Sequence, residues 1–302
     1  MEQTVSSAEE KPLWRKIVDF PLVAMLIAVG AVVIGLVLSY LITANLMPRI
    51  PALGFDGVLD LVGIPIILVI YKLFIVRLGR RPRDELPPEG SVRLLSYGLL
   101  GGFLIFSLIV AVAALLGVYS ITGGGDLSGL SRALVAMAIF PGVSEEILFR
   151  GVLFRWLEEF GGSWLALLLT SAFFGAAHLM NPGASPIAAV GIAFEAGVML
   201  GAAYMLTRSL WLPIGLHAAW NFTQGEIYDI PVSGLPVHGV VNAKLCCNPL
   251  LTGNGFGLEA SLITIVVATL FGIWLLWLAV RKGELVQPMW SHRQRFREPE
   301  AA

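Results

Sequence analysis

The chain has 302 residues, 57% of them hydrophobic and only 14% charged, and its mean hydropathy is +0.81. Soluble domains carry about 25% charged residues, so this composition places the chain in the membrane class. The net charge of −1 gives no general affinity for nucleic acid, and the sequence has neither a Rossmann fingerprint nor a phosphate-binding loop. The two cysteines, Cys246 and Cys247, are adjacent, so they cannot cross-link distant parts of the fold or form a zinc motif.

Apolar stretches recur along the chain with the length needed to cross a bilayer, about 20 residues. They predict an all-α membrane protein, a polytopic bundle of about eight transmembrane helices around an intramembrane polar cavity. Short connections join the fifth to seventh stretches, so these should pack as neighbours, although a shallow re-entrant helix would show the same pattern there. The predicted spans are 20–46, 58–78, 94–121, 130–158, 163–180, 186–207, 210–228 and 259–280.

These spans divide the chain into four parts. A cytoplasmic tail (1–19) precedes the first transmembrane helices (20–129), a core with unusual polar residues follows (130–228), and an outer loop, a last helix and a cytoplasmic tail complete the chain (229–302). The first span is long and follows a charged tail, which predicts a retained helix rather than a cleaved signal peptide. The outer loop is rich in Gly, Pro and Asn, and either a substrate-selecting gate or a passive connection fits it.

The basic residues predict the orientation of the bundle. With the N-terminus inside and the sides alternating, fifteen Lys and Arg residues fall on the inner side and three on the outer side, while Lys72 and Arg150 lie within spans. This distribution satisfies the positive-inside rule and predicts that both termini are cytoplasmic. The inner set is Lys11, Arg15, Lys16, Arg77, Arg80, Arg81, Arg83, Arg93, Arg155, Arg208, Arg281, Lys282, Arg293, Arg295 and Arg297, and the outer set is Arg49, Arg132 and Lys244.

The fourth span contains charged residues that are costly in a bilayer: Glu145, Glu146 and Arg150. Residues four apart share a helix face, whereas adjacent residues diverge by about 100°. Glu146 is therefore expected to pair with Arg150, and Glu145 to point elsewhere without a local cation. An unpaired, desolvated carboxyl suits a general base. The spacing assigns the chemistry to Glu145 and a supporting role to Glu146 and Arg150.

Two later spans repeat the four-residue spacing. Phe174 and His178 share a face in the fifth span, and His217 and Asn221 share one in the seventh. A neutral imidazole can shuttle a proton, and an asparagine amide can donate to a developing oxyanion. Together with Glu145 these groups could activate water against an amide.

Each of these residues also has a structural interpretation. A histidine in a bundle core is often only a packing residue, a Glu–Arg pair can simply lock two helices, and Asn221 could bridge helices. Glu195, in the sixth span, stays unassigned, because a helix contact, snorkelling and function all fit it. Packing alone is nevertheless a poor reason to remove six polar groups from water.

The ordered motifs Glu145-Glu146-x-x-x-Arg150, Phe174-x-x-x-His178 and His217-x-x-x-Asn221 resemble those of the CPBP intramembrane proteases. This family includes the type II CAAX prenyl endopeptidases and the bacterial, bacteriocin-linked Abi-type members. The resemblance covers about residues 130–225 and makes 130–228 a CPBP-like catalytic core. It implies eight helices around a conical membrane cavity and hydrolysis of a peptide bond at the bilayer.

By the same resemblance, Glu145 would activate water, His178 would assist, and His217 with Asn221 would stabilise the oxyanion, while Glu146, Arg150 and Phe174 organise the site. The implied partners are the lipid bilayer and a membrane protein, prenylated peptide or other peptide as substrate, and the expected location is a prokaryotic cell membrane. The family is often labelled metalloprotease, and Zn²⁺ on His178, His217 and Glu145 is the alternative to a cofactor-free site. The sequence lacks an H-E-x-x-H pair, so we favour glutamate-dependent catalysis without a metal.

Two other functions compete with an endopeptidase. A non-catalytic immunity or assembly factor would bind a peptide in the same cavity, and its phenotype would survive Glu145→Ala. A transporter or proton relay would also place Glu and His in the membrane, but the sequence shows no inverted repeat and no paired broken helices.

Overall fold

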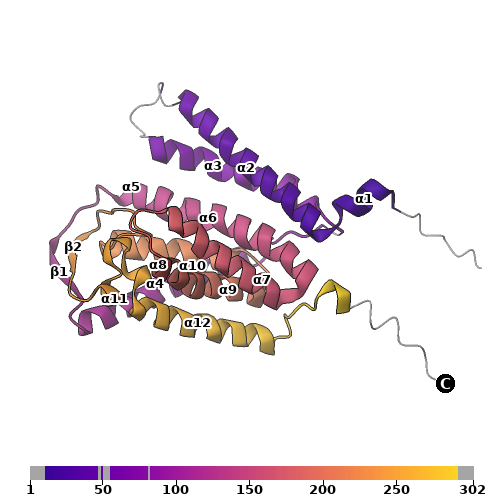
Figure 1. Cartoon of the computed structure of the whole chain (residues 1–302). Coiled ribbons are helices and arrows are strands. Elements are labelled where there is room, and N and C mark those ends of the chain that lie inside the picture. The colour runs from indigo at the N-terminus through magenta and orange to yellow at the C-terminus, as the bar shows by residue number, and fades with distance from the viewer. Residues whose placement is uncertain (1–10, 47–48, 50–54, 81, 292–302) are drawn as a thin grey trace, which may run out of the picture.

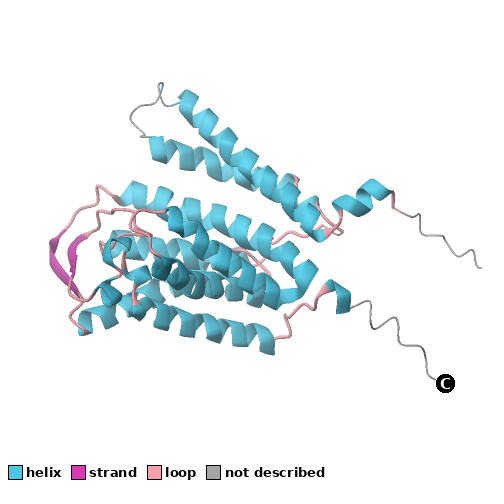
Figure 2. Ribbon diagram, in the orientation of Figure 1, coloured by secondary structure: helices cyan, strands magenta, loops and turns pink. Residues whose placement is uncertain are grey.

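The computed structural model describes residues 11–46, 49, 55–80 and 82–291. Within these ranges the protein is a helical bundle with a two-stranded sheet at one end (Figures 1 and 2). The ends of both predicted cytoplasmic tails (1–10 and 292–302) lie outside the described residues, and so do Arg81, Arg293, Arg295 and Arg297 of the predicted inner set.

The N-terminal part forms a helical pair and a third long helix. In Figure 1, α2 and α3 lie together along one side of the bundle and α12 lies along the opposite side. The predicted span 94–121 is wrong at its end, because the helix stops at Leu115 and Gly117, with φ +71°, turns the chain. The elements are α1 (Leu13–Val18), α2 (Pro21–Leu46), α3 (Phe55–Leu73), a 3₁₀ turn η3 (Ile75–Arg77) and α4 (Ser91–Leu115).

A continuous helical run from Leu130 to Met180 contains two of the predicted spans. It turns at Gly162, where φ is +83° and ψ is 169°, a conformation that glycine adopts without a Cβ penalty. The run comprises α5 (Leu130–Arg132), η4 (Ala133–Ile139), α6 (Phe140–Glu146), η5 (Ile147–Phe154), α7 (Arg155–Ala177) and the 3₁₀ turn η6 (His178–Met180).

Four segments of the core, η4, η5, η7 and η8, have π-helical geometry. Such segments often occur at functional sites, because their altered backbone hydrogen-bond pattern changes the direction of side chains and carbonyls. The sixth and seventh predicted spans consist of α8 (Pro186–Ile192), η7 (Ala193–Val198), α9 (Met199–Thr207), α10 (Trp211–Phe222) and η8 (Thr223–Ile227).

The predicted outer loop is structured and pairs with the segment after α4. The strands β1 and β2 are antiparallel, with Tyr119 opposite Leu245, and Asp229 accepts backbone N–H groups from Gly239 and Ala243. The cysteines are free thiols here, and Cys246 donates to the Gly117 carbonyl. The elements are β1 (Tyr119–Gly124), β2 (Val241–Leu245), α11 (Pro249–Thr252), 3₁₀ turns η9 (Asn254–Phe256) and η10 (Leu258–Ala260), and α12 (Leu262–Arg281).

Among the described residues, five helices are long and apolar enough to cross a membrane: α2, α4, Leu130–Met180, Pro186–Thr207 and α12. The chain is therefore an all-α polytopic membrane protein. The segment Leu130–Met180 accounts for two of the eight predicted spans, one on each side of Gly162. Two further predicted spans exist as helices but not among these five, because α3 contains Asp56, Asp60 and Lys72, and the segment 211–227 is short.

Helices α4 and α10 pack with their backbones in contact. A Cβ atom at Gly98 would lie 2.4 Å from the Leu212 carbonyl oxygen, and one at Gly102 would lie 2.4 Å from that of Leu216. The spacing Gly98-x-x-x-Gly102 is the small-residue pattern that allows close helix approach in membranes. This contact fixes α10, which carries His217 and Asn221, against a long membrane helix.

The start of α10 is fixed by a polar network around Glu85, a fully buried residue of the loop before α4. Its backbone carbonyl accepts from Leu210 N–H, directly before α10. Its carboxylate accepts from the hydroxyls of Tyr71 and Tyr204, and Arg83 lies 3.0 Å away. The charged, proline-rich connection between η3 and α4, which lies on the predicted inner side, is thus a structural part of the bundle.

Candidate active site

The predicted pair of Glu146 and Arg150 forms in the core of the bundle. Arg150 Nη1 donates to Glu146 Oε1 over 2.8 Å, and neither side chain is exposed. The i,i+4 spacing places the two groups on one face, as predicted. A fully buried ion pair needs further hydrogen bonds to offset its desolvation.

Arg150 obtains these contacts from a different helix. Its Nη2 atom donates to the carbonyls of Ala196 (3.2 Å) and Gly197 (3.3 Å), both in the π-helical segment η7. Its guanidinium also lies 4.8 Å from the centroid of the Phe174 ring, a cation–π distance. Arg150 therefore joins three helices, and Phe174 is one wall of its site.

His217 meets the same carboxylate from α10. Its Nδ1 atom lies 3.0 Å from Glu146 Oε1, and the ring is buried. A carboxylate paired with Arg150 accepts, so Nδ1 carries the proton and Nε2 is the remaining nitrogen. The first and third motifs are thus in direct contact through Glu146, which supports both Arg150 and His217.

His178 is held by its own helix and by the aromatic residue of its motif. Its Nδ1 atom lies 2.7 Å from the Phe174 carbonyl oxygen, and the two rings are 4.8 Å apart. Because a carbonyl can only accept, Nδ1 donates, and Nε2 of the neutral ring presents a lone pair. This half-buried imidazole can therefore accept a proton.

Asn221 uses one of its donors to fix its position. Its Nδ2 donates to the Met137 carbonyl over 2.8 Å, and the side chain is buried. An amide nitrogen has two N–H groups, so a second donor remains available. The contact also ties α10 to η4.

His178, His217 and Asn221 line one small polar cavity of ≈ 20 Å³. Two carboxylates that the sequence did not assign to the site line it as well. Glu195 comes from η7 and is 1% exposed, and Glu259 comes from η10 and is 4% exposed. The volume is enough for a water molecule, which needs about 10–15 Å³.

Glu145 lies beside this cavity without lining it. The residue is partly buried, its Oε2 atom has no hydrogen-bond partner, and it forms no ion pair with any described residue. It is close enough to interact electrostatically with His217 and Arg150. The expectation that Glu145 has no paired cation is therefore met within the part of the chain that the structure describes.

The metal alternative requires three ligands at about 2.0–2.3 Å from one point. No group of three or more His, Cys, Asp or Glu residues among the described residues is arranged to hold a metal ion. Of the predicted ligands, only His178 and His217 line the shared cavity, and Glu145 is not part of its lining. These residues do not fit a zinc site in this arrangement.

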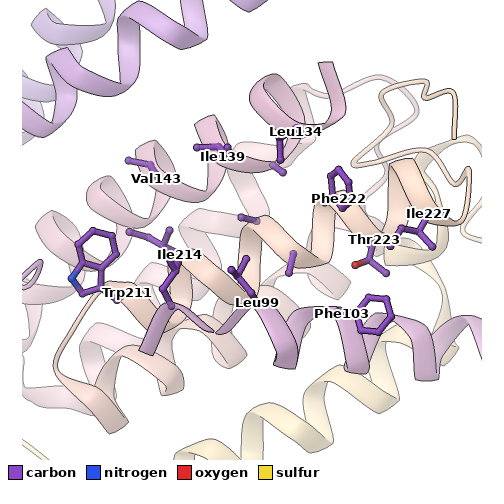
Figure 3. Close-up of a pocket in the computed structure, with 14 residues that line it drawn as sticks. Leu99, Phe103, Leu134, Ile139, Val143, Trp211, Ile214, Phe222, Thr223 and Ile227 are labelled. Atoms are coloured by element: carbon purple, nitrogen blue, oxygen red, sulfur yellow. The ribbon is translucent and has the colours of Figure 1, made fainter. Parts of the chain in front are cut away.

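An apolar groove runs along the neighbouring face of α10. It has a volume of ≈ 550 Å³, in the range of ligand-binding pockets, and its walls come from α4, α10 and the η4–α6 segment. Figure 3 shows Leu99 and Phe103 of α4 and Ile214 and Phe222 of α10 around it, with Ile139 and Val143 opposite. Helix α10 thus separates a polar cavity from an apolar groove.

Two carboxyl groups of the cavity were not predicted as site residues. Glu195 carries the general signal of a carboxyl in an apolar span, but the 3.6-residue period does not give its direction because it lies in a π-helical segment. No local pattern in the sequence marks Glu259 as a site residue. It reaches the site because Trp220 Nε1 and the N–H and hydroxyl of Ser233 donate to its carboxylate.

A comparison with protein families matches residues 128–223 to the model described as Rce1-like, type II CAAX prenyl endopeptidase Rce1-like. The match contains all three motifs and confirms the resemblance to the CPBP intramembrane proteases over this segment. No curated protein and no solved structure matched the chain.

Proposed function

Because residues 128–223 match the Rce1-like family of CAAX-type intramembrane endopeptidases, we propose that this protein hydrolyses a peptide bond with Glu145 as the base. One observation carries the proposal. Three of the four predicted catalytic side chains, those of His178, His217 and Asn221, converge on one water-sized cavity inside an apolar bundle. Packing would not require a proton acceptor, an imidazole and an amide donor to face a common space.

In the proposed reaction, water adds to the carbonyl carbon of the scissile bond while its proton passes to Glu145. His178 assists, since its Nδ1 donates to Phe174 and leaves Nε2 to accept from the water. The tetrahedral intermediate then collapses, the C–N bond breaks, and the leaving nitrogen takes the proton from Glu145. The products are a carboxylate and an amine, and no step uses a metal.

The oxyanion would be stabilised from α10. In this role His217 is protonated on both nitrogens, so that Nδ1 donates to Glu146 and Nε2 to the oxyanion, and Asn221 donates the N–H that Met137 does not use. Donors preorganised in a dry site act on the developing charge without reorganisation. Glu146 and Arg150 orient His217, and the α4–α10 contact keeps both donors in place.

The groove suggests the substrate class. Its apolar walls suit the hydrocarbon chain of a membrane-tethered or prenylated peptide, whose scissile bond would lie on the polar side of α10. We propose that the protein is oriented with both termini in the cytoplasm of a prokaryotic cell, since the basic residues favour the inner side.

The test compares protein termini in membranes that contain the wild type or Glu145→Ala at equal abundance. We expect new termini only with the wild type, because Glu145→Ala removes the base and leaves the buried ion pair intact. Identical termini would reject proteolysis, and a phenotype that persists in Glu145→Ala would favour the peptide-binding immunity or assembly role.

Metal analysis tests whether Glu145 activates the water without a metal or whether Zn²⁺ takes part. We expect active, purified protein to contain less than one zinc per chain and to keep its activity after dialysis against a chelator. Stoichiometric zinc, lost together with activity and restored with it, would show that the metal-free proposal is wrong.

A further inference from the structure

Glu195 is a buried carboxyl group that the proposed mechanism does not use. It lies in the Pro186–Thr207 membrane helix, 1% exposed, and neither of its oxygens has a hydrogen-bond partner among the described residues. Arg150 approaches the same segment but binds the backbone carbonyls of Ala196 and Gly197, not the Glu195 side chain. Such a group is costly in a membrane interior unless it serves a function.

The surroundings of Glu195 indicate what it binds. It lines the ≈ 20 Å³ cavity between His178 and His217, and this volume admits one water molecule but no larger ligand. One O–H of the water can donate to a Glu195 oxygen and the other stays available to His178 and Glu145, and before substrate binds the water oxygen can accept from the free N–H of Asn221. Glu259 is a less suitable acceptor, because Trp220 and Ser233 already donate to its oxygens.

We propose that Glu195 binds one water molecule in this cavity and positions it for hydrolysis. This inference rests on the proposed function and adds a second carboxylate to it. Glu195 accepts a hydrogen bond from one O–H of the water, and Glu145, beside the cavity, takes the proton of the other O–H when the water attacks. Glu195 is therefore a positioning residue, and no bond to it forms or breaks.

Purified wild type, Glu195→Gln and Glu195→Leu should be compared on a fluorescence-quenched peptide that carries a farnesylated cysteine near its carboxyl terminus. We expect Glu195→Gln to lower kcat about 10²-fold with KM unchanged, the size of effect expected for a misplaced reacting group. The loss should be smaller than that of Glu145→Gln. A value of kcat equal to that of the wild type would overturn the positioning role.

Glu226→Gln is the matched control. Glu226 is also a buried glutamate, 2% exposed, with no hydrogen-bond partner for either oxygen among the described residues, but it does not line the cavity. Its kcat should equal that of the wild type. Thermal unfolding adds a second distinction: Glu195→Leu should unfold at a temperature no lower than the wild type, since an unpaired carboxyl gives way to an apolar group. A large destabilisation of Glu195→Leu, with normal kcat in Glu195→Gln, would indicate a structural role.

An experimental structure at a resolution that reveals ordered water tests the binding directly. We expect a water molecule within hydrogen-bond distance of Glu195 in the wild type and none in Glu195→Leu. An empty wild-type cavity would overturn the inference even if the protein cleaves peptides. If the wild type holds this water but cleaves no peptide, the proposed function is wrong and only the binding of water by Glu195 is confirmed.

Discussion

Glu145→Gln is expected to lower kcat by about 10²–10⁴-fold, the contribution of a positioned general base. Glutamine has nearly the same size as glutamate but cannot accept the proton of the attacking water. Glu145 forms no ion pair with the described residues, so its replacement leaves the buried Glu146–Arg150 pair in place. The measurement is the rate of cleavage of the farnesylated peptide by purified protein, together with the thermal unfolding temperature.

The unfolding temperature of Glu145→Gln should stay close to that of the wild type, and Glu226→Gln should keep both rate and stability. Full activity in Glu145→Gln would remove Glu145 from the mechanism and leave Glu195 and Glu259 as the carboxyl groups that line the cavity with the two imidazoles. Loss of folding in Glu145→Gln would instead assign a structural role to Glu145.

The largest effect on stability is expected for Arg150→Met. Removing one member of a buried ion pair leaves the other charge without compensation and costs about 3–5 kcal/mol. Here the charge left behind is that of Glu146, which is fully buried and, among the described residues, retains only His217 as a partner. The contacts to the Ala196 and Gly197 carbonyls and to the Phe174 ring are lost as well. Unfolding in detergent by heat or denaturant measures the difference.

The double variant Glu146→Gln/Arg150→Met provides the control. It removes both charges, so it should recover most of the stability lost in the single variant, while cleavage stays impaired because His217 has lost its carboxylate. If Arg150→Met is as stable as the wild type, the contacts of Arg150 with Glu146 and with the neighbouring helices do not stabilise the bundle. A double variant that cleaves normally would show that Glu146 does not orient His217.

Local patterns in the sequence predicted the helices and one of the site contacts. Hydropathy located the helical segments because a membrane helix needs a long apolar run, and the i,i+4 rule predicted the Glu146–Arg150 pair because both residues lie on one helix. The strand pair β1–β2 was not predicted, since both strands are short, β1 ends in two glycines, and the strands come from distant parts of the chain.

Contacts between helices could not be read from these patterns. His217 meets Glu146 only because α10 packs on α6, and Glu259 reaches the cavity from a turn outside the core. The assignment of Glu195 depends on π-helical geometry, which the 3.6-residue period does not describe. Local spacing therefore identified residues that act within one helix, and tertiary packing decided which of them share a cavity.

The glycine contact between α4 and α10 restricts how a substrate can enter. Since the two backbones touch at Gly98 and Gly102, we expect these helices to move together. Both contribute walls to the apolar groove, so widening that groove requires displacement of its third wall, the η4–α6 segment. This segment packs against α3, so we expect the α2–α3 pair to be the part of the bundle that yields if the substrate is a bulky lipidated chain. The same wall holds the proposed oxyanion donors, since Asn221 donates to Met137 of η4 and His217 contacts Glu146 of α6, so opening the groove is expected to loosen these donors as well.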